Sequence, residues 1–428
     1  MRTGRLCLGM LLVGWMWLGQ ARGADIVQET VAAGKWQPLW DGKTLNGWHA
    51  IGTGKWTIEN GQIVGTHAAK DKQFGGHLVT NASYRDFVAR VKFKLVKGES
   101  GLYFRISELR DGDIAGLKAV IDARGNAGGL YERNGRTPEW VAKPIPEDVK
   151  KWFKPNDWNE MVVAALGRTL VVYVNGMKSA EVRNDPGRLP EGKLALQLAA
   201  GEDCQIYLKD LQIMPFESLT AKDLAAFAKP TGEWKLAGNV VVDTADGKTF
   251  LADEGGGAIY NGGNGRTNNL FTAAQYGDVA AHIEFMIPRK SNSGVYFQGR
   301  YEIQIYDSFG VERDEYPGIE CGGIYPRWIN ETNKDGHSPR VNASLPPGQW
   351  QSFDVIFQAP KFGAGARSAY GRFVKVVHNG QVIHENVPVS GPTRAAAFND
   401  EKPLGPLMFQ GDHGPVAYRN VCVYRLGK

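Results

Sequence analysis

Cysteine is scarce in this sequence, which has four in 428 residues, and Cys7 lies in an apolar segment near the N-terminus. The other three, Cys204, Cys321 and Cys422, lack the spacing of a disulfide framework or of a zinc knuckle. We interpret them as small buried apolar residues, although one pair could form a disulfide. The scarcity argues against a disulfide-stapled fold and a cysteine-based metal site.

A large excess of charge of one sign is also lacking, because the formal net charge is only +5. Arg2 and Arg5 precede an apolar run at 6–18 and small residues follow, which predicts a signal peptide over residues 1–23. Its removal takes away three arginines and lowers the net charge to +2. Nucleic acid and anionic membranes are therefore not indicated as partners, and the run is short for a membrane span. We expect a periplasmic or secreted protein.

Motifs of nucleotide and metal chemistry are absent as well. No glycine-rich phosphate loop stands between a strand and a helix, and no HExxH or EF-hand spacing occurs. No cofactor is predicted for this reason. A divalent metal ion stays an alternative, because Glu302, Asp307 and His413 could supply oxygen and nitrogen ligands.

Helical periodicity is sparse, with short candidates only at 146–152 and at 220–227, where Thr220 would cap the helix. Elsewhere short strand-like runs alternate with Gly, Pro and Asn-Gly. Asn60-Gly61 and Asn379-Gly380 favour type I′ hairpins, since both residues accept positive φ. This pattern predicts an all-β protein built as a sandwich or jelly roll.

An internal repeat divides the chain. The segment Tyr84-Arg85-Asp86-Phe87 and the eighteen or so residues after it recur from Tyr276 onward. A block beginning at Trp158 recurs at Trp350, and the block 192–213 matches 403–424. Three matching blocks in one order indicate a duplication. We expect one sandwich over 36–216, a short helical linker over 217–233 and a second sandwich over 234–428.

A polar row stands out in the second copy. Strand-like runs cover 279–287, 294–298 and 301–306, and in the last of these Glu302, Gln304 and Tyr306 are two residues apart. Their side chains must therefore project from one face of a strand. Because a carboxylate beside a carboxamide is costly in a dry core, the row predicts a ligand groove.

Several motifs, in this order, resemble the 3-keto-disaccharide hydrolase domain family. They are PLWDGKTLNGW at 38–48, SNSGVYF at 291–297, EIQIYDS at 302–308, Trp350, and Asn379-Gly380. The resemblance covers nearly all of the chain after the signal segment, as two tandem copies. It implies concanavalin A-like jelly rolls and exported bacterial relatives that cleave glycosides oxidised to a ketone at C3, by elimination and hydration. The ketone would come from a separate sugar 3-dehydrogenase.

Comparison of the copies suggests where the chemistry lies. Aligning 117–122 with 302–307 places Leu117 opposite Glu302 and Ala119 opposite Gln304. The first copy would thus lack the polar row and be a degenerate partner. We expect the second copy to carry the active site.

A 3-keto-glycoside needs a base for its C2 hydrogen and an acid for the leaving oxygen. Glu302 and His413 could share these roles in either order, with Asp307 as a third catalytic candidate. Amides and guanidinium groups would hold the charge on the C3 oxygen, and aromatic rings would stack on the sugar. The predicted substrate-binding residues are Asn292, Gln304, Tyr306, Tyr325, Arg327, Trp328, Gln410 and Arg419.

Each of these residues also has a structural interpretation. His413 could cap a turn in Gly-Asp-His-Gly-Pro, and Asp307 could lie on the face opposite Glu302. Arg327 and Arg419 could form surface ion pairs, and the aromatic residues could belong to the core. The predicted function is an exported enzyme that cleaves 3-keto-glycosides. The alternatives are a non-catalytic carbohydrate-binding protein, since jelly rolls host both, and a structural or adhesive surface protein.

Overall fold

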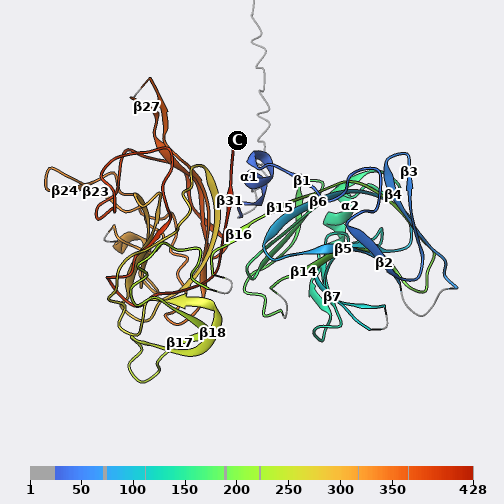
Figure 1. The fold of residues 1–428 in the computed structure, drawn as a ribbon, viewed down its shortest axis with the longest axis horizontal. Helices are drawn as coiled ribbons and strands as arrows, with labels where there is room; N and C mark the ends of the chain where they lie inside the picture. Colours follow the sequence, from blue (N-terminus) through green and yellow to red (C-terminus); the bar gives the residue numbers. More distant parts are fainter. Residues whose placement is uncertain are drawn as a thin grey trace, which may run out of the picture.

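A computed structural model describes residues 25–70, 75–110, 112–187, 190–220, 223–316, 318–364 and 366–427. The predicted signal peptide lies outside these residues. The described part consists of two antiparallel β-sandwiches side by side (Figure 1). None of its helices is long and apolar enough to cross a membrane. The expectation of an all-β protein with two sandwiches is confirmed.

The first sandwich has a larger sheet with the order β13-β12-β11-β6-β15-β4-β3, in which β1 also pairs with β15. Its second sheet has the order β10-β9-β8-β7-β14-β5-β2. The strands are β1 Gln37–Pro38, β2 Trp48–Gly52, β3 Lys55–Glu59, β4 Gln62–His67, β5 Gly76–Tyr84, β6 Phe87–Lys97, β7 Ser100–Glu108, β8 Ile114–Ile121, β9 Leu130–Arg133, β10 Trp140–Ala142, β11 Asn159–Leu166, β12 Thr169–Val174, β13 Met177–Val182, β14 Gly192–Leu198 and β15 Cys204–Pro215.

The second sandwich has a larger sheet with the order β17-β18-β31-β20-β25-β28-β29, in which β16 also pairs with β31. Its smaller sheet is β19-β30-β21-β22, and two hairpins are separate. The strands are β16 Glu217–Ser218, β17 Lys235–Val242, β18 Phe250–Tyr260, β19 Leu270–Phe271, β20 Val279–Met286, β21 Asn292–Phe297, β22 Tyr301–Tyr306, β23 Arg327–Ile329, β24 Thr332–Lys334, β25 Gln351–Gln358, β26 Lys361–Gly363, β27 Ala366–Ala369, β28 Gly371–His378, β29 Gln381–Val389, β30 Met408–Phe409 and β31 Ala417–Arg425.

Turn chemistry places several of these strands where the sequence predicted them. Asn60 and Gly61 have φ of 51° and 69° between β3 and β4, and Asn379 and Gly380 have 49° and 84° between β28 and β29. The two type I′ hairpins are thus confirmed. Helix α2 (Pro146–Trp152) is also confirmed, with proline in its first turn and lysines in its last.

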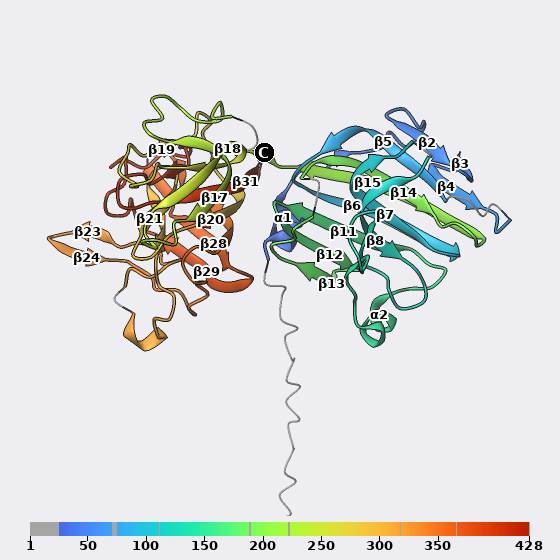
Figure 2. The same cartoon turned by 90° about the horizontal axis from the view of Figure 1, so that it is seen from below.

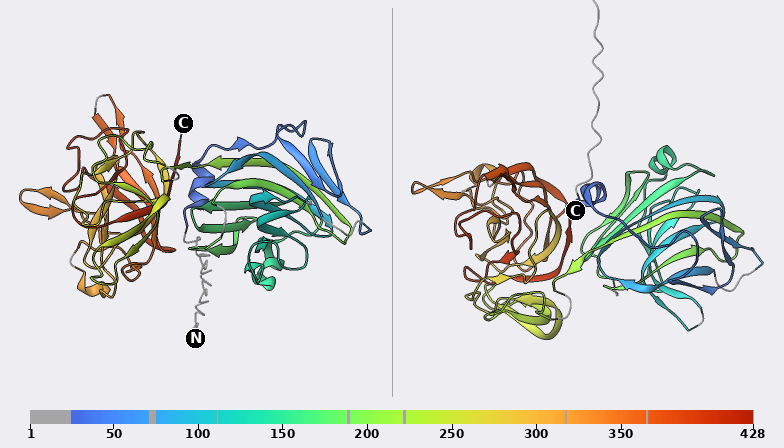
Figure 3. Two further views of the ribbon diagram at one scale, coloured as in Figure 1. Left: turned by 60° about the horizontal axis from the view of Figure 1, so that its bottom comes forward. Right: turned by 45° about the horizontal axis from the view of Figure 1, so that its top comes forward.

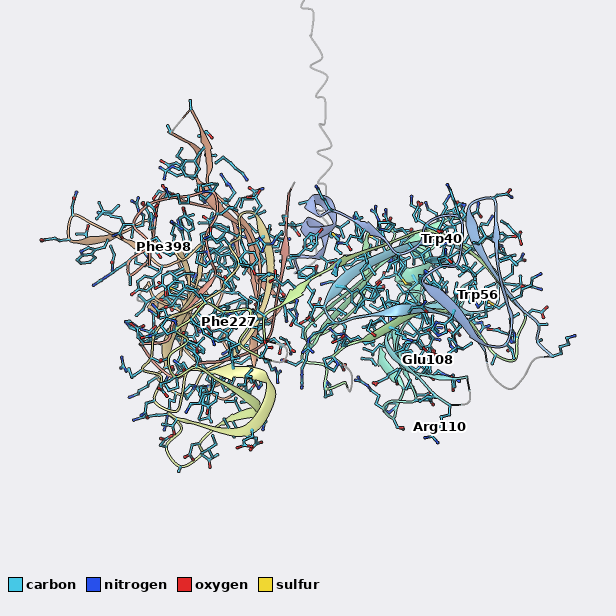
Figure 4. All side chains as sticks on the ribbon, in the orientation of Figure 1. Trp40, Trp56, Glu108, Arg110, Phe227 and Phe398 are labelled. Atoms are coloured by element: carbon cyan, nitrogen blue, oxygen red, sulfur yellow. The ribbon has the colours of Figure 1, made fainter. Side chains whose placement is uncertain are left out.

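The linker is not helical in its described part, so that prediction was wrong. Glu217 and Ser218 form β16, which pairs with Val423 and Cys422 at the edge of β31. Phe227 forms an isolated β-bridge with Thr272 and packs, 4% exposed, into the second sandwich (Figure 4). Pairing with β31 and burial of Phe227 therefore stabilise this segment more than a short isolated helix would, because such a helix is marginal in water.

The two larger sheets also pack against each other, so each has two buried faces. A buried apolar cluster joins Val162 and Val171 of the first sandwich to Ala280 and Ile356 of the second. Helix α1 (Val27–Ala33), which the sequence analysis missed, lies between the sandwiches and adds Val27 to the cluster (Figures 1 and 3). This second contact explains why every residue of β20 is buried.

Charged groups of this interface are buried together. On β20, His282 Nδ1 lies 2.6 Å from Asp354 Oδ1 and its Nε2 lies 3.4 Å from Glu284 Oε1. From the first sandwich, Arg183 pairs with Asp354 at 3.1 Å, and the Arg168 backbone N–H donates to Glu284 Oε1 at 2.9 Å. The carboxylates raise the pKa of His282 to about 9 despite its burial, so the imidazole is charged.

Gly167 marks the closest approach of the first sandwich to these groups. Its φ is +53°, and an added Cβ would lie 2.6 Å from Glu284 Oε1 and 2.6 Å from Asn420 Cβ. We expect Gly167→Ala to lower the free energy of unfolding by about 2–3 kcal/mol, because strain and overlap add. Gly176→Ala is the matched control, since Gly176 has φ of +78° with nothing within 4 Å. If urea denaturation shows that both variants lose the same free energy of unfolding, the contact of Gly167 with the second sandwich is unimportant for stability.

Candidate active site

A pocket of about 220 Å³ lies over β21 and β22 of the second sandwich. The predicted residues that it brings together come from two strands and two loops. They are Asn292, Glu302, Gln304, Tyr325, Gln410 and His413. The pocket is also lined by Tyr296, Arg394 and Ala395, which the sequence analysis did not select.

Glu302 is the buried carboxyl of this pocket. It pairs across the sheet with Tyr296. Its backbone N–H donates to Thr393 Oγ1 at 3.3 Å, and its carbonyl oxygen accepts from the Tyr325 backbone N–H at 3.1 Å. Burial raises the pKa of Glu302 to about 8, opposed by a hydrogen bond from Tyr296 and reinforced by the charge of Asp412. Because the side chain is only 2% exposed, it is a neutral carboxylic acid at pH 7.

A carboxamide pair lies beside this acid. Gln304 Nε2 donates to Asn292 Oδ1 at 3.2 Å. When the Gln304 amide is turned over, its nitrogen donates instead to the Ser293 carbonyl at 2.8 Å and to Glu302 Oε1 at 3.2 Å. Gly294 pairs with Gln304 in the sheet and leaves room for the Glu302 carboxyl, which an added Cβ would overlap. The predicted ligand-facing row thus has an acid and two amides at one place.

His413 enters the pocket from the loop between β30 and β31. Its Nδ1 lies 2.6 Å from Asp412 Oδ1, and Arg266 holds the loop by donating to the Asp412 carbonyl at 2.7 Å. The Asp412 contact leaves Nε2 as the nitrogen available to a ligand. Because the His413 side chain is 46% exposed, the imidazole can reach both solvent and substrate.

Tyr325 and Arg394 form the remaining wall. Burial, followed by the Glu302 charge, raises the pKa of Tyr325, so its hydroxyl stays protonated as a donor. The Arg394 guanidinium lies 4.2 Å from the ring centre of Trp328. Trp328 itself is 50% exposed on the β23–β24 hairpin, which projects from the second sandwich (Figure 2). The predicted aromatic residue therefore lies outside the pocket but contacts its wall.

Four other predicted residues are not in the pocket. Asp307 accepts from the Lys290 backbone N–H at 2.8 Å and holds the turn before β21. Tyr306 ends β22 beyond Gln304, and Arg327 donates to Ser390 Oγ at 2.9 Å. Arg419 lies at the interface instead, where its Nε donates to Glu284 at 2.6 Å.

The predicted metal ligands are not assembled. Glu302 and His413 line the pocket, but Asp307 lies outside it. The described residues contain no group of three or more His, Cys, Asp and Glu side chains suited to a metal ion. The three cysteines outside the N-terminal segment, Cys204, Cys321 and Cys422, are buried free thiols.

The alignment of the two copies needs a correction of one residue. Ser100 pairs with Ile121 in the first copy and Ser293 with Ile305 in the second, which places Lys118 opposite Glu302. Lys118, 4% exposed, donates to Glu99 Oε1 at 2.6 Å and to Gln197 Oε1 at 3.2 Å. The first copy therefore has the salt-bridged Lys118 at the position of Glu302 in the second copy, and Val120 at the position of Gln304.

The space beside the acid can be tested with Gly294→Ala. The added methyl group would displace the Glu302 carboxyl, so we expect kcat on the substrate proposed below to fall by about tenfold or more with little change in unfolding. Gly101→Ala is the matched control in the first copy, since its Cβ would meet the flexible Lys118 side chain at 2.6 Å and the Ala119 carbonyl oxygen at 3.0 Å, and no catalytic candidate. Equal activity of both variants would contradict the assignment of Glu302.

Comparison with known proteins identifies relatives of both halves. A family model described as the 3-keto-alpha-glucoside-1,2-lyase-like domain matches residues 35–214 and 215–423. The 3-keto-disaccharide hydrolase of Bacteroides thetaiotaomicron is 33% identical over 103 residues, which are 22% of this chain and 35% of that protein. The match thus spans about a third of the length of this relative.

Solved structures are also similar to part of this chain. A candidate glycosyl hydrolase from Parabacteroides distasonis has 25% identity and a TM-score of 0.37, covering 49% of this chain and 84% of that one. A carbohydrate-binding module from Bacillus subtilis has 16% identity and a TM-score of 0.30, covering 39% and 93%.

Proposed function

This chain belongs to the 3-keto-alpha-glucoside-1,2-lyase-like family as two tandem copies, and from this we propose that its second copy cleaves 3-keto-glycosides. The observation that carries the proposal is the pocket itself. It holds a carboxylic acid that is neutral at pH 7 together with an imidazole oriented by an aspartate. A general acid and a general base in one pocket are what an elimination requires.

The roles follow from the protonation states. His413 Nε2 takes the proton from C2, and the C–H electrons form an enolate whose charge lies on the C3 oxygen. The enolate then expels the group at C1, and Glu302 gives its proton to the leaving oxygen. Water adds to the resulting double bond, which releases the 3-keto sugar. The alternative order, with Glu302 as base, is disfavoured because a carboxyl with a pKa of about 8 holds its proton at neutral pH.

Donors in the pocket would stabilise the enolate. Tyr325 offers a protonated hydroxyl, Asn292 offers an amide from the start of β21, and Gln410 offers one from just after the end of the neighbouring β30. Arg394 supplies the cation that the sequence analysis sought in Arg327 and Arg419. Pre-organised donors of this kind contribute about 3–4 kcal/mol each to transition-state stabilisation.

One assay separates an enzyme from a carbohydrate-binding protein. We expect the purified protein to cleave a 3-keto-glucoside and to leave the matching glucoside intact. Run in D₂O, the reaction should place deuterium at C2 of the product, because the base exchanges its proton with solvent. Tight binding without turnover would favour the lectin alternative, and turnover without deuterium would favour direct hydrolysis at C1.

Two further parts of the proposal concern the cell. Export by the N-terminal segment would place the enzyme in the periplasm or outside the cell. A separate sugar 3-dehydrogenase would supply the ketone, since the described residues of the proposed site offer no redox group.

A further inference from the structure

A second cavity, of about 460 Å³, lies between the two sandwiches and shares no residue with the Glu302 pocket. Its volume is in the range of small-ligand sites, which is about 300–1,000 Å³. The first sandwich contributes Arg85, Arg105 and Arg168 to the wall, and the second contributes Asn239, Trp350 and Arg419. The wall therefore exists only because the two copies are joined.

Two of the four wall arginines are fully engaged by the protein. Arg105 donates to the carbonyls of Arg85 and Gly167 at 2.7–2.9 Å and lies 3.3 Å from Asp86. Arg419 is paired with Glu284 at 2.6 Å. Neither guanidinium group has much capacity left for a ligand.

The wall carboxylates are engaged as well. Arg136 forms ion pairs with both Glu132 and Asp185, and its contact with Asp185 has two hydrogen bonds of 2.7 and 3.0 Å. These acids therefore do not neutralise the other wall cations.

Arg168 and Arg85 are different. Among the described residues no carboxylate pairs with the Arg168 guanidinium, and Arg85 Nε is buried without a hydrogen bond, 3.7 Å from Asp86. Arg168 and Arg419 both line this cavity. Burial lowers the pKa of Arg419, Glu284 opposes that shift, and the nearby charge of Arg168 adds to it. A buried donor without a partner is costly, which favours an anionic ligand here.

The rest of the wall suits a sugar. Trp350 supplies apolar surface, and Asn239 supplies a carboxamide that can both donate and accept. The amide nitrogens of Asn134 and Asn420 donate to Asp113 and Glu284, which leaves their oxygens as acceptors for a ligand. At Gly257 an added Cβ would meet nothing within 4 Å, so the backbone is open to a ligand. We infer that this cavity binds an acidic saccharide, with Arg168 and Arg85 on its carboxylate and the carboxamides on its hydroxyl groups.

The test compares two disaccharides that differ in one carboxylate, cellobiouronic acid and cellobiose, by titration calorimetry. We expect the acid to bind at least tenfold more tightly to the full chain, and Arg168→Gln to remove that advantage. Arg372→Gln, which removes a cation from β28 outside the cavity, should retain it. Glu302→Gln should also retain it, which separates this site from the proposed catalytic one.

Three results would overturn the inference. They are equal affinity for the two disaccharides, unchanged affinity in Arg168→Gln, and loss of binding in Glu302→Gln. If millimolar inorganic phosphate competes for the cavity as strongly as cellobiouronic acid does, the cavity is a simple anion site. That result would also overturn the inference of a saccharide ligand.

Discussion

Glu302→Gln is expected to lower kcat on a 3-keto-glucoside by about a thousandfold, within the usual contribution of general acid catalysis. Glutamine keeps the shape and the hydrogen-bonding capacity toward Tyr296 and Gln304 but has no proton for the leaving oxygen. Glu320→Gln is the control, because Glu320 is another buried carboxyl of the same sandwich, 2% exposed and outside the pocket. It should keep full activity.

The dependence of activity on pH should show which protonation state of Glu302 is active. The acid form is the active one, so activity should be present below the pKa of Glu302 and fall as the pH rises through about 8. In Glu302→Gln the remaining activity should lack this basic limb. A basic limb that persists in the variant would assign it to another group.

The leaving group distinguishes the two catalytic roles. A nitrophenyl 3-keto-glucoside needs no protonation to depart, so it should restore much of the activity of Glu302→Gln. The same substrate should not rescue His413→Ala, because the C2 proton must still be removed. Rescue of His413→Ala alone would exchange the roles of the two residues.

The sequence predicted the parts of this site that depend on local pattern. Alternation placed Glu302 and Gln304 on one face of β22, and asparagine with glycine placed the hairpins. Tyr296 was missed because an aromatic residue in an apolar strand has the pattern of a core residue. Arg394 was missed because a loop far along the chain carries it, and only tertiary packing brings it to the pocket.

Two of the errors have identifiable physical origins, the contact between the copies and the register of a strand. Arg419 resembles a ligand-binding cation in sequence, yet its partner Glu284 is buried only because a second sheet covers β20. Aligning the copies by sequence alone also left a slip of one residue, which turns every side chain of a strand to its other face and placed Leu117 instead of Lys118 opposite Glu302. Neither the covering sheet nor the register can be obtained from one strand alone.

His282→Gln should reveal how much the buried charges at this interface contribute to stability. In the folded protein the pKa of His282 is about 9, against 6.5 for a free histidine, and the carboxyl pKa values of Glu284 and Asp354 are about 2. A raised pKa means stabilisation that is complete below about pH 6.5 and disappears as the pH rises through 9. We therefore expect the variant to lose about 3 kcal/mol of unfolding free energy at pH 6.

The loss should shrink as the pH rises, which is the distinctive part of the expectation. By pH 10 the wild-type imidazole is neutral, and the charge-dependent difference in urea midpoint between wild type and His282→Gln should have largely closed. His378→Gln is the matched control, since burial lowers the pKa of His378 to about 3 and it is neutral throughout this range. Its destabilisation should be constant from pH 7 to 10. A constant difference for His282→Gln as well would mean that the buried histidine is neutral and that its charge does not stabilise the interface.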